Sequence, residues 1–400
     1  MKKLLFIVVL AIVWQSCHVG RFFIYNFADI NDYKKFPKKE LIKSTQPFYF
    51  YEAASSSSVL RLPKTFTKKT KEYTFNQALK NTGTVAFIAI RNDSILYQWY
   101  APNYNVSSIV PSFSMAKSYV SALMGIAIGE GFIKNTNEPI TAYLPYLDKT
   151  KFGNVTIQHL LDMRSGIKSI ENYFNPFGDI AKYYYGKNLK KYCRHLKIKE
   201  APGKTFEYIS LNTQLLSLII ENATGKSVAT YLQEKIWAPI GCEFEASWSV
   251  DSKKHQTEKA FCCINARAKD FAKFGRLYLN KGNWQGKQLV PKDWVTESVS
   301  FTDTKNNFMY SNQWWHTRYF YPEMDTVKLH KPYVLKTVKN KEGNNIKTAI
   351  TPDGNFFAEG FLGQYIYVAP KANMVFVRLA KKDGWINWGS VFQKIADGKY

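Results

Sequence analysis

Ser114 and Lys117 have the side-chain types and the spacing that nucleophilic catalysis requires. They stand three residues apart, and on a helix this spacing places both side chains on one face, one turn apart. A serine hydroxyl is a poor nucleophile until a base takes its proton. A lysine that is shielded from solvent has a lowered pKa, so it can act as that base near neutral pH. The pair therefore predicts acyl transfer through a serine ester.

The stretch around this pair predicts a buried helix. Between Ser112 and Gly131 nearly every position is apolar, and a helix that is apolar on all faces lies inside a protein or in a membrane. The stretch is too short and too well delimited to span a bilayer. We expect Ser112 to be its N-cap, and Gly129 and Gly131 to end it. The unpaired N–H groups of its first turn would suit a developing oxyanion.

The Ser-x-x-Lys pattern alone is a weak signal in a lysine-rich chain. A second copy runs from Ser165 to Lys168, where the glycine after the serine indicates a turn and no long apolar helix follows. We interpret that copy as chance. For Ser114 and Lys117 the alternative is a capping serine beside a lysine whose stem lies along the surface. Further motifs are needed to decide between these interpretations.

The composition indicates a well-packed protein with a basic surface. The 400 residues, 46% hydrophobic and 16% aromatic, suit one large domain or two closely packed ones. The formal net charge is +24, but the lysines are scattered. We find no zinc-finger, helix-turn-helix or RNP pattern, so we expect no nucleic-acid partner. A solvated basic surface is our preferred interpretation, and weak attraction to a membrane face is the alternative.

The cysteines give no sign of a metal or redox site. There are five of them: Cys17, Cys193, Cys242, Cys262 and Cys263. None forms a C-x-x-C pair, so we expect no zinc, and we expect no other metal or cofactor. Their odd number and scatter do not suggest a disulfide framework, and we expect the adjacent Cys262 and Cys263 to be packed in the interior.

The N-terminal residues predict export. A basic start at residues 1–3 precedes an apolar run over residues 4–14, which is the layout of a secretory signal. Cys17 follows a small residue and resembles a lipoprotein processing site, at which the cysteine becomes lipidated. The alternatives are an uncleaved anchor that reaches Tyr25, and a buried first strand. We therefore expect a cell-envelope protein, either periplasmic or membrane-anchored through its N-terminus.

Three segments follow from the composition along the chain. Residues 1–25 form the signal peptide or membrane anchor, residues 26–75 an extended arm or linker, and residues 76–400 the main folded domain. The arm contains lysine pairs, prolines and a run of serines, which is typical of a linker with local order. Residues 317–350 are polar and rich in lysine, and there we expect an insertion or surface hairpins.

The order of elements predicts an α+β fold. Strands at 84–90 and 94–100 flank a turn and form a hairpin. Further elements are expected as helices at 212–224, 228–237 and 266–280, strands at 355–361, 364–368 and 374–380, and a final helix at 387–396. An antiparallel sheet that the C-terminal strands close, with a mostly helical middle, accounts for this order.

With these motifs in order, the chain resembles the serine β-lactamase and penicillin-binding-protein family, above all its class C and esterase branch with the 6-aminohexanoate-dimer hydrolases. The motifs that carry the likeness are Ser114-Met-Ala-Lys117, Leu160 to Ile167, Pro202-Gly203, Tyr208-Ile-Ser210, Thr213 to Leu216, Asn265 with Asp270 to Leu277, and Gly360 with Gly363-Gln364. Several motifs in the right order are far more specific than any one of them. The resemblance implies a β-lactamase/transpeptidase-like fold, with an antiparallel sheet flanked by helices and a mostly helical subdomain.

The resemblance also implies roles for individual residues. Ser114 would be the nucleophile, Lys117 the base, and Tyr208 a proton shuttle whose phenol pKa the nearby ammonium lowers; a core aromatic is the alternative for Tyr208. The oxyanion would lie between the backbone N–H groups of Ser114 and Phe361. Gly360, just before Phe361, would let the backbone approach the substrate closely.

The chain departs from the family pattern at two triplets. Ser210 stands where the family's Y-x-N triplet has an amide, and Ala358-Glu359-Gly360 stands where it has K-T-G. The missing lysine normally faces a substrate carboxylate. Its loss argues against an efficient β-lactamase or D-Ala-D-Ala peptidase, and favours an esterase or an amidase.

Two further positions are open to two interpretations each. Tyr173 lies where the dimer hydrolases have a substrate loop, and it is either a substrate contact or an ordinary loop aromatic. Asn265 either faces the pocket or caps the helix at 266–280, and we favour the cap.

We therefore expect an exported serine hydrolase that cleaves a small-molecule ester or amide. The alternative is a non-catalytic receptor or scaffold on the penicillin-binding fold, which binds cell-wall fragments. The intact Ser, Lys and Tyr set favours the enzyme, because a binding protein need not keep a buried amine beside a hydroxyl. The chain has no G-x-S-x-G or H-E-x-x-H motif, so we do not expect an α/β-hydrolase or a metalloenzyme.

Overall fold

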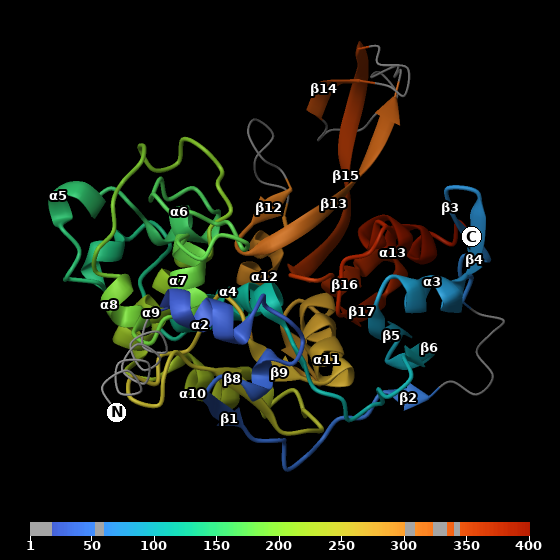
Figure 1. Ribbon diagram of the computed structural model, residues 1–400, viewed down its shortest axis with the longest axis horizontal. Coiled ribbons are helices and arrows are strands. Elements are labelled where there is room, and N and C mark those ends of the chain that lie inside the picture. Colours follow the sequence, from blue (N-terminus) through green and yellow to red (C-terminus); the bar gives the residue numbers. More distant parts are fainter. Residues whose placement is uncertain (1–17, 53–59, 301–308, 323–333, 340–344) are drawn as a thin grey trace, which may run out of the picture.

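The computed structural model describes residues 18–52, 60–300, 309–322, 334–339 and 345–400, and a large, mostly antiparallel sheet forms its centre (Figure 1). The strands lie in the order β12-β13-β15-β16-β17-β5-β6-β2, and β14 pairs with β15. Their bounds are β2 Tyr51–Glu52, β5 Thr84–Arg91, β6 Ser94–Tyr100, β12 Tyr310–Ser311, β13 Trp314–Pro322, β14 Val334–Lys339, β15 Asn345–Gly360, β16 Gln364–Ala369 and β17 Met374–Ala380. Because β17 pairs with β5, the C-terminal strands close the sheet on the first hairpin, as the sequence predicts.

The β5–β6 hairpin carries apolar side chains on both faces, since helices cover the sheet on each side. Its turn residues Asn92 and Asp93 both have positive φ, the conformation of the two-residue turns that suit twisted strands. On one face Phe87 stacks on Phe392 of α13 (Trp388–Ala396), with ring centroids 5.8 Å apart. On the other face α11 (Ala268–Leu279) packs so closely on β16 and β17 that a Cβ on Gly275 would meet Val375 at 2.6 Å.

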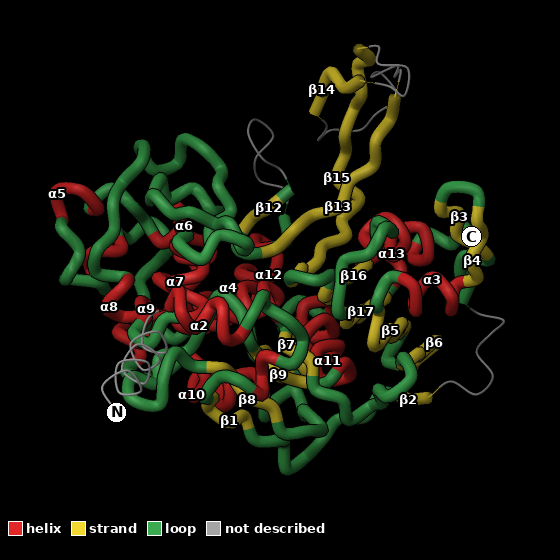
Figure 2. Tube along the Cα trace, in the orientation of Figure 1, coloured by secondary structure: helices red, strands yellow, loops and turns green. Residues whose placement is uncertain are grey.

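The remaining helices gather to one side of the sheet (Figure 2). They are α4 Ala116–Gly129, α5 Lys149–Phe152, α6 Ile157–Leu161, α7 Asp179–Tyr185, α8 Leu189–Tyr192, α9 Ser210–Thr224, α10 Val228–Leu232 and α12 Lys292–Ser298, while α3 Phe75–Asn81 lies by the sheet. A smaller sheet of order β1-β8-β9-β7 underlies them, with bounds β1 Lys38–Leu41, β7 Val110–Pro111, β8 Ala246–Ser249 and β9 Ile264–Ala266. Two-stranded ribbons are β3 Thr65–Lys68 with β4 Lys71–Thr74, and β10 Asn283–Trp284 with β11 Lys287–Gln288. The predicted α+β architecture is confirmed.

The helix expected after Ser112 is the most deeply buried one in this group. A short 3₁₀ turn at Phe113–Met115 leads into α4, and every residue from Ala116 to Ala127 is buried. Its apolar character on all faces therefore reflects a position in the protein interior.

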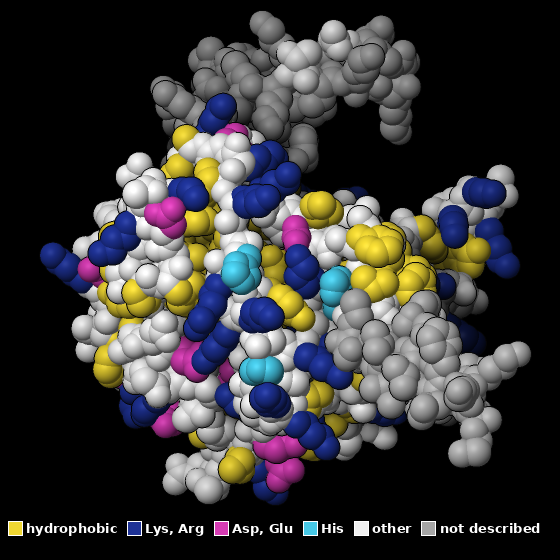
Figure 3. Space-filling view, turned by 60° about the vertical axis from the view of Figure 1, so that its left-hand side comes forward, with side chains coloured by type: hydrophobic (Ala, Val, Ile, Leu, Met, Phe, Trp, Pro, Cys, Tyr) yellow, Lys and Arg dark blue, Asp and Glu magenta, His cyan; other side chains and the backbone are white. Residues whose placement is uncertain are grey.

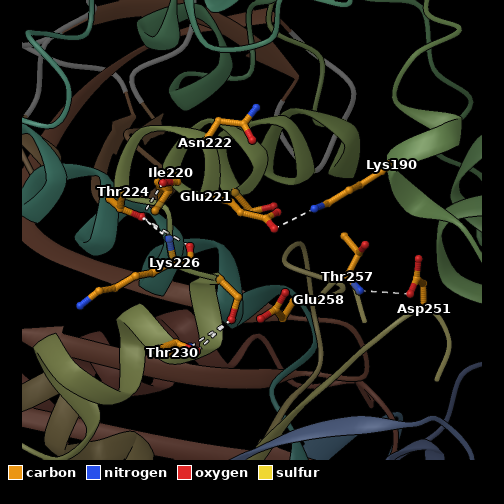
Figure 4. A network of polar contacts seen from close by, with 12 residues as sticks. Lys190, Ile220, Glu221, Asn222, Thr224, Lys226, Thr230, Asp251, Thr257 and Glu258 are labelled. Carbon is orange, nitrogen blue, oxygen red and sulfur yellow. Dashed lines mark hydrogen bonds and ion pairs between the residues drawn. The ribbon is translucent and has the colours of Figure 1, made fainter. Parts of the chain in front are cut away.

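α9 runs beside α4, and polar contacts at its C-terminal end hold it in place (Figure 4). Glu221 accepts a hydrogen bond from Lys190 Nζ at 2.7 Å. The Thr224 hydroxyl donates to the Ile220 carbonyl at 2.7 Å and accepts the Lys226 N–H at 3.2 Å. Gly225 then ends the helix with a positive φ of 70°, as expected for a C-terminal glycine. These contacts fix the direction of the helix whose first residue is Ser210.

The described part of the segment expected to be an extended arm or linker is instead folded onto the domain, where β1 pairs with β8 from Lys38 to Leu41. α2 (His18–Tyr25), at the end of the segment expected to be a signal peptide or anchor, packs on α7. Ile30, Phe36 and Leu41 are buried in the main core. The linker prediction was wrong here because lysines on the outer face of a short edge strand give the same composition as a linker. Cys17 and the apolar run before it lie outside the described residues.

Residues 317–350 contribute to a long projection rather than to the core. β13, β14 and β15 form antiparallel pairs that extend away from the body of the molecule (Figure 1). Surface hairpins were predicted for this stretch, and the strand pairing agrees with that prediction.

On the face shown in Figure 3, basic side chains lie among acidic and uncharged side chains instead of forming one continuous patch. Within the described ranges, no helix combines the length and the apolar character that crossing a membrane requires.

Candidate active site

Lys117 joins three parts of the chain at the first turn of α4. Its Nζ donates hydrogen bonds to Ser114 Oγ at 3.0 Å, to Ser210 Oγ at 3.1 Å and to the Phe261 carbonyl at 2.9 Å. The side chain is only 1% exposed. Three acceptors match the three donors of an ammonium, so the lysine is held in one orientation with its nitrogen at the serine hydroxyl.

Burial decides the protonation of this lysine. It lowers the pKa of Lys117 from its ordinary value to about 7, while the negative charge of Glu171 works in the opposite direction. A substantial fraction of the amine is therefore uncharged at neutral pH. An uncharged amine 3.0 Å from a hydroxyl can accept its proton.

The turn that carries Ser114 is anchored to β9 through Ser112. The Ser112 N–H donates to the Ile264 carbonyl at 2.7 Å, and the Ser112 hydroxyl accepts the Ile264 N–H at 3.1 Å. Ser112 therefore stands at the predicted N-cap position of the turn that leads into α4, but its side chain makes no capping bond and binds the neighbouring strand instead. Phe113 has a positive φ of 43°, a strained conformation for a residue with a side chain. The strain lies directly before the serine and sets the direction in which it projects.

Tyr208 lies over the same amine. Lys117 Nζ is 5.1 Å from the centroid of the Tyr208 ring, whose other contacts include a stacked Trp315 at 5.6 Å. Burial raises the pKa of Tyr208, and the nearby carboxylates of Glu171 and Glu359 raise it further. The expected lowering of its pKa is therefore wrong, because desolvation outweighs the hydrogen bond with Ser114, which acts in the lowering direction.

Glu171 completes the site, and the sequence pattern had not singled it out. Its carboxylate accepts the Ser210 hydroxyl at 2.5 Å, the Ser210 backbone N–H at 3.0 Å and the Tyr173 hydroxyl at 3.0 Å. A hydroxyl at position 210 needs an acceptor for its proton while it receives the lysine's hydrogen bond. The departure from the family's amide at this position is the signal that could have pointed to a nearby carboxylate.

The end of β15 lies against the serine turn. A Cβ on Gly360 would stand 2.3 Å from the Ser112 carbonyl oxygen, so only glycine permits this approach. The next residue, Phe361, packs edge-on against Phe113 and stacks on Tyr173 at 5.3 Å. Glu359, at the threonine position of the family's K-T-G triplet, accepts a hydrogen bond from the Tyr365 hydroxyl. Burial raises the pKa of its carboxyl group.

Two pockets meet at Ser114. The first, with an empty volume of about 520 Å³, is bordered by Ser114, Ser210 and otherwise by apolar and aromatic side chains. The second, of about 580 Å³, is bordered by Ser114, Tyr208, Trp315, Glu359 and Asp383. Tyr173 and Phe361 border both pockets, and their stacked rings form the wall between them.

Comparison with known protein families assigns the chain to one of them. The beta-lactamase family profile matches residues 74–389, well over half of the chain. The chain belongs to the beta-lactamase family. Its relatives include the 6-aminohexanoate-dimer hydrolase of Paenarthrobacter ureafaciens, which is 27% identical over 266 residues. That alignment covers 60% of this chain and 66% of the relative, just under two thirds of it.

Solved structures of other proteins share the fold of this beta-lactamase family member. A candidate 6-aminohexanoate-dimer hydrolase from Bacillus anthracis has a TM-score of 0.71 at 24% identity, and the match covers 91% of this chain and 90% of that one. EstCE1, a hydrolase with promiscuous acyltransferase activity, has a TM-score of 0.56 at 12% identity, with 81% and 96% covered. The fold is that of β-lactamases and transpeptidases, and with the family it makes the chain a serine hydrolase.

Asn265 borders neither pocket, and unlike Lys117, which borders neither but hydrogen-bonds to Ser114, it takes its partners from the smaller sheet. It stands in β9 of this beta-lactamase family member, where its side-chain amide donates to the hydroxyls of Ser247 and Ser249 at 3.1 Å each. Arg267, and not Asn265, occupies the N-cap position of α11. Both sequence interpretations of Asn265 are therefore wrong, because the chain stays extended for longer before the helix begins.

Cys262 and Cys263 are buried, as expected, and they form a disulfide with each other, which the odd number and scatter of the five cysteines did not suggest. The bond follows Phe261, whose carbonyl accepts the Lys117 hydrogen bond. Cys262 also borders the first pocket. Cys193 and Cys242 are free and buried.

Proposed function

We propose that the chain hydrolyses a small ester or amide through an acyl-enzyme formed on Ser114. The observation that supports this most directly is the 3.0 Å hydrogen bond from a buried Lys117 amine to the Ser114 hydroxyl. A lysine with a pKa near 7 is suited to remove a proton from serine at neutral pH. The same lysine would be too costly to bury for packing alone.

Acylation begins when Ser114 Oγ attacks the substrate carbonyl carbon. Lys117 Nζ takes the hydroxyl proton, and the electron pair of the carbonyl double bond moves onto its oxygen. The backbone N–H groups of Ser114 and Phe361 are the proposed donors to this oxyanion, and Gly360 brings the second of them close to the serine turn.

The tetrahedral intermediate then collapses. Tyr208, a neutral phenol because burial raises its pKa, gives its proton to the leaving oxygen or nitrogen and regains one from the Lys117 ammonium. The bond to the leaving group breaks, and the acyl group stays on Ser114. A water molecule attacks this ester, Lys117 takes the proton of the water, and the acid leaves as Ser114 regains its hydroxyl.

An ester or amide without a recognised carboxylate is the proposed substrate class. Ala358 stands where family members that bind a carboxylate have a lysine, and the neighbouring Glu359 borders the second pocket, so an anionic substrate would meet a like charge there. The name of the Paenarthrobacter relative, a 6-aminohexanoate-dimer hydrolase, supports amide cleavage over β-lactam cleavage. We therefore expect slow turnover of nitrocefin compared with p-nitrophenyl esters.

Fluorophosphonate labelling tests the proposal. We expect peptide mass spectrometry to find the label on Ser114, and the S114A and K117A variants to lose it. Lys168→Ala is the matched control, because it removes the lysine of the second Ser-x-x-Lys copy and should leave labelling unchanged. A folded wild-type protein that stays unlabelled would favour a receptor that binds cell-wall fragments.

We also propose export to the cell envelope, with lipidation at Cys17. The basic start and apolar run of residues 1–14 support it. The Cys262–Cys263 disulfide favours an oxidising compartment. The mass of the N-terminal peptide from expressing bacteria is the test: it should begin with a lipidated Cys17 and retain residues 1–16 in the C17A variant. An intact N-terminus in the cytosolic fraction of wild type would contradict the proposal.

A further inference from the structure

We infer that the first pocket binds the acyl half of the substrate and selects an uncharged, aliphatic acyl chain, and that the segment before the hydrolase domain shapes this choice. The inference rests on the proposed function, since it assigns the two sides of Ser114 to the two halves of a substrate. It extends the proposed function by stating which kind of acyl group the first pocket accepts. It also names residues before the family profile that determine this preference.

The position of Tyr208 assigns the pockets. Tyr208 borders the second pocket and not the first, and it is the proposed donor of the proton to the leaving group. The leaving group therefore lies in the second pocket. The stacked Tyr173 and Phe361 rings separate the pockets, so the acyl chain extends on the other side of that wall.

The chemistry of the first pocket excludes a charged acyl group. Its described lining includes no Asp, Glu, Lys, Arg or His. Three of its tyrosine hydroxyls donate to partners of their own: Tyr173 to Glu171, Tyr184 to Asp32 at 2.6 Å, and Tyr185 to the Asn26 carbonyl at 2.7 Å. These rings therefore offer carbon surface, and a charge buried among them would have no partner.

Residues before the hydrolase domain form one side of this pocket. Phe27 and Ala28 border it, although the family profile begins only at residue 74. The Phe27 ring packs edge-on against Phe174, which also borders the pocket, with ring centroids 5.5 Å apart. The hydrogen bonds from Tyr184 and Tyr185 hold the segment in place. Because this wall lies outside the family profile, the acyl preference that it sets need not follow that of other family members.

A series of p-nitrophenyl esters tests the acyl preference of the full chain. From acetate to hexanoate we expect kcat/KM to rise about fourfold for each methylene buried, which corresponds to about 0.8 kcal/mol each. The 6-aminohexanoate ester and the hemi-ester of adipic acid have similar reach but a charged end. Both should be at least tenfold poorer than hexanoate. Equal rates for hexanoate and either charged ester, or no rise from acetate to hexanoate, would overturn the inference.

Variants of Phe27 and Ala28 test the contribution of the N-terminal segment to acyl selectivity. Ala28→Trp should fill the pocket and Phe27→Ala should remove its outer wall, and each should lower the hexanoate-to-acetate ratio of kcat/KM at least fivefold. Phe27 is 46% exposed, so its truncation should leave a folded protein even where the tryptophan variant does not. Ala201→Trp, on an exposed turn, is the control and should keep the wild-type ratio.

The two proposals fail in different ways. Ratios that stay at the wild-type value in folded F27A and A28W overturn the acyl-pocket inference, while fluorophosphonate labelling of Ser114 still supports the hydrolase. Absence of labelling together with absence of hydrolysis of every ester overturns both.

Discussion

Ser210 donates two hydrogen bonds to Glu171, one from its hydroxyl at 2.5 Å and one from its backbone N–H at 3.0 Å. The same hydroxyl accepts a hydrogen bond from Lys117 Nζ at 3.1 Å. A single serine hydroxyl thus connects a carboxylate to the buried amine. Burial favours the neutral amine and the carboxylate favours the charged one, so Glu171 tunes how readily Lys117 gains and loses its proton.

Removing the charge of Glu171 should shift the pH dependence of activity. In Glu171→Gln the pKa of Lys117 falls, because the charge that raises it is gone, and the acid limb of kcat/KM moves to lower pH. We expect about a tenfold loss at the plateau, since the hydrogen bonds to a charged acceptor are weakened. Glu207→Gln, which removes a surface partner of Lys199, is the control. An unchanged acid limb in E171Q would contradict this role.

The wild-type pH profile should report Lys117 itself. Only the uncharged amine can accept the serine proton, and its pKa is lowered to about 7. We expect kcat/KM for a p-nitrophenyl ester to rise with pH through about 7 and then to level off. A profile that is flat from pH 5 to 9, or that falls across this range, would contradict a lysine base.

Lys117 should also make stability depend on pH. Its pKa is about 7 in the folded protein and near 10.5 in the unfolded chain, so between these values the unfolded state binds more protons and stability rises with pH. Relative to Lys117→Met, wild type should gain roughly 2 to 3 kcal/mol of unfolding free energy from pH 6.5 to pH 9. Urea denaturation at both pH values measures this, and Lys168→Met should show no such change.

Loss of the Tyr208 hydroxyl should lower activity most for substrates with poor leaving groups. In Tyr208→Phe the leaving group receives no proton, so we expect a loss of roughly 100-fold or more for an anilide or alkyl ester. A p-nitrophenyl ester, whose leaving group departs as an anion, should lose much less. Tyr310→Phe is a close control, because its ring centroid lies 5.7 Å from that of Tyr208 but it borders neither active-site pocket. Equal losses on both substrates would rule out proton donation.

Gly360→Ala should damage both stability and activity. Its Cβ would stand 2.3 Å from the Ser112 carbonyl oxygen, so either β15 or the serine turn must move. We expect a cost of about 1 to 3 kcal/mol in unfolding free energy and a drop in kcat. Gly389→Ala is the matched control, because the added Cβ would meet only the end of Asn387 at 3.6 Å. Wild-type kcat in a folded G360A would contradict the proposed position of the oxyanion donors.

Local patterns in the sequence were enough to predict several elements. The apolar run after Ser112 predicted the buried helix α4, because residues apolar on every face have no other place in a folded protein. The β5–β6 hairpin and the start of α13 at Asn387 were likewise predictable, since turns and caps depend on neighbouring residues.

Contacts between distant parts of the chain depended on the tertiary structure. The three acceptors of Lys117 lie 3, 93 and 144 residues away, and only the first follows from helical spacing. Ser112 and Asn265 have typical capping side chains, yet both are used to join strands. The choice depends on which backbone groups come within hydrogen-bond distance after packing. The direction of the Tyr208 pKa shift also depended on the tertiary structure, because the depth of burial is a property of the whole fold.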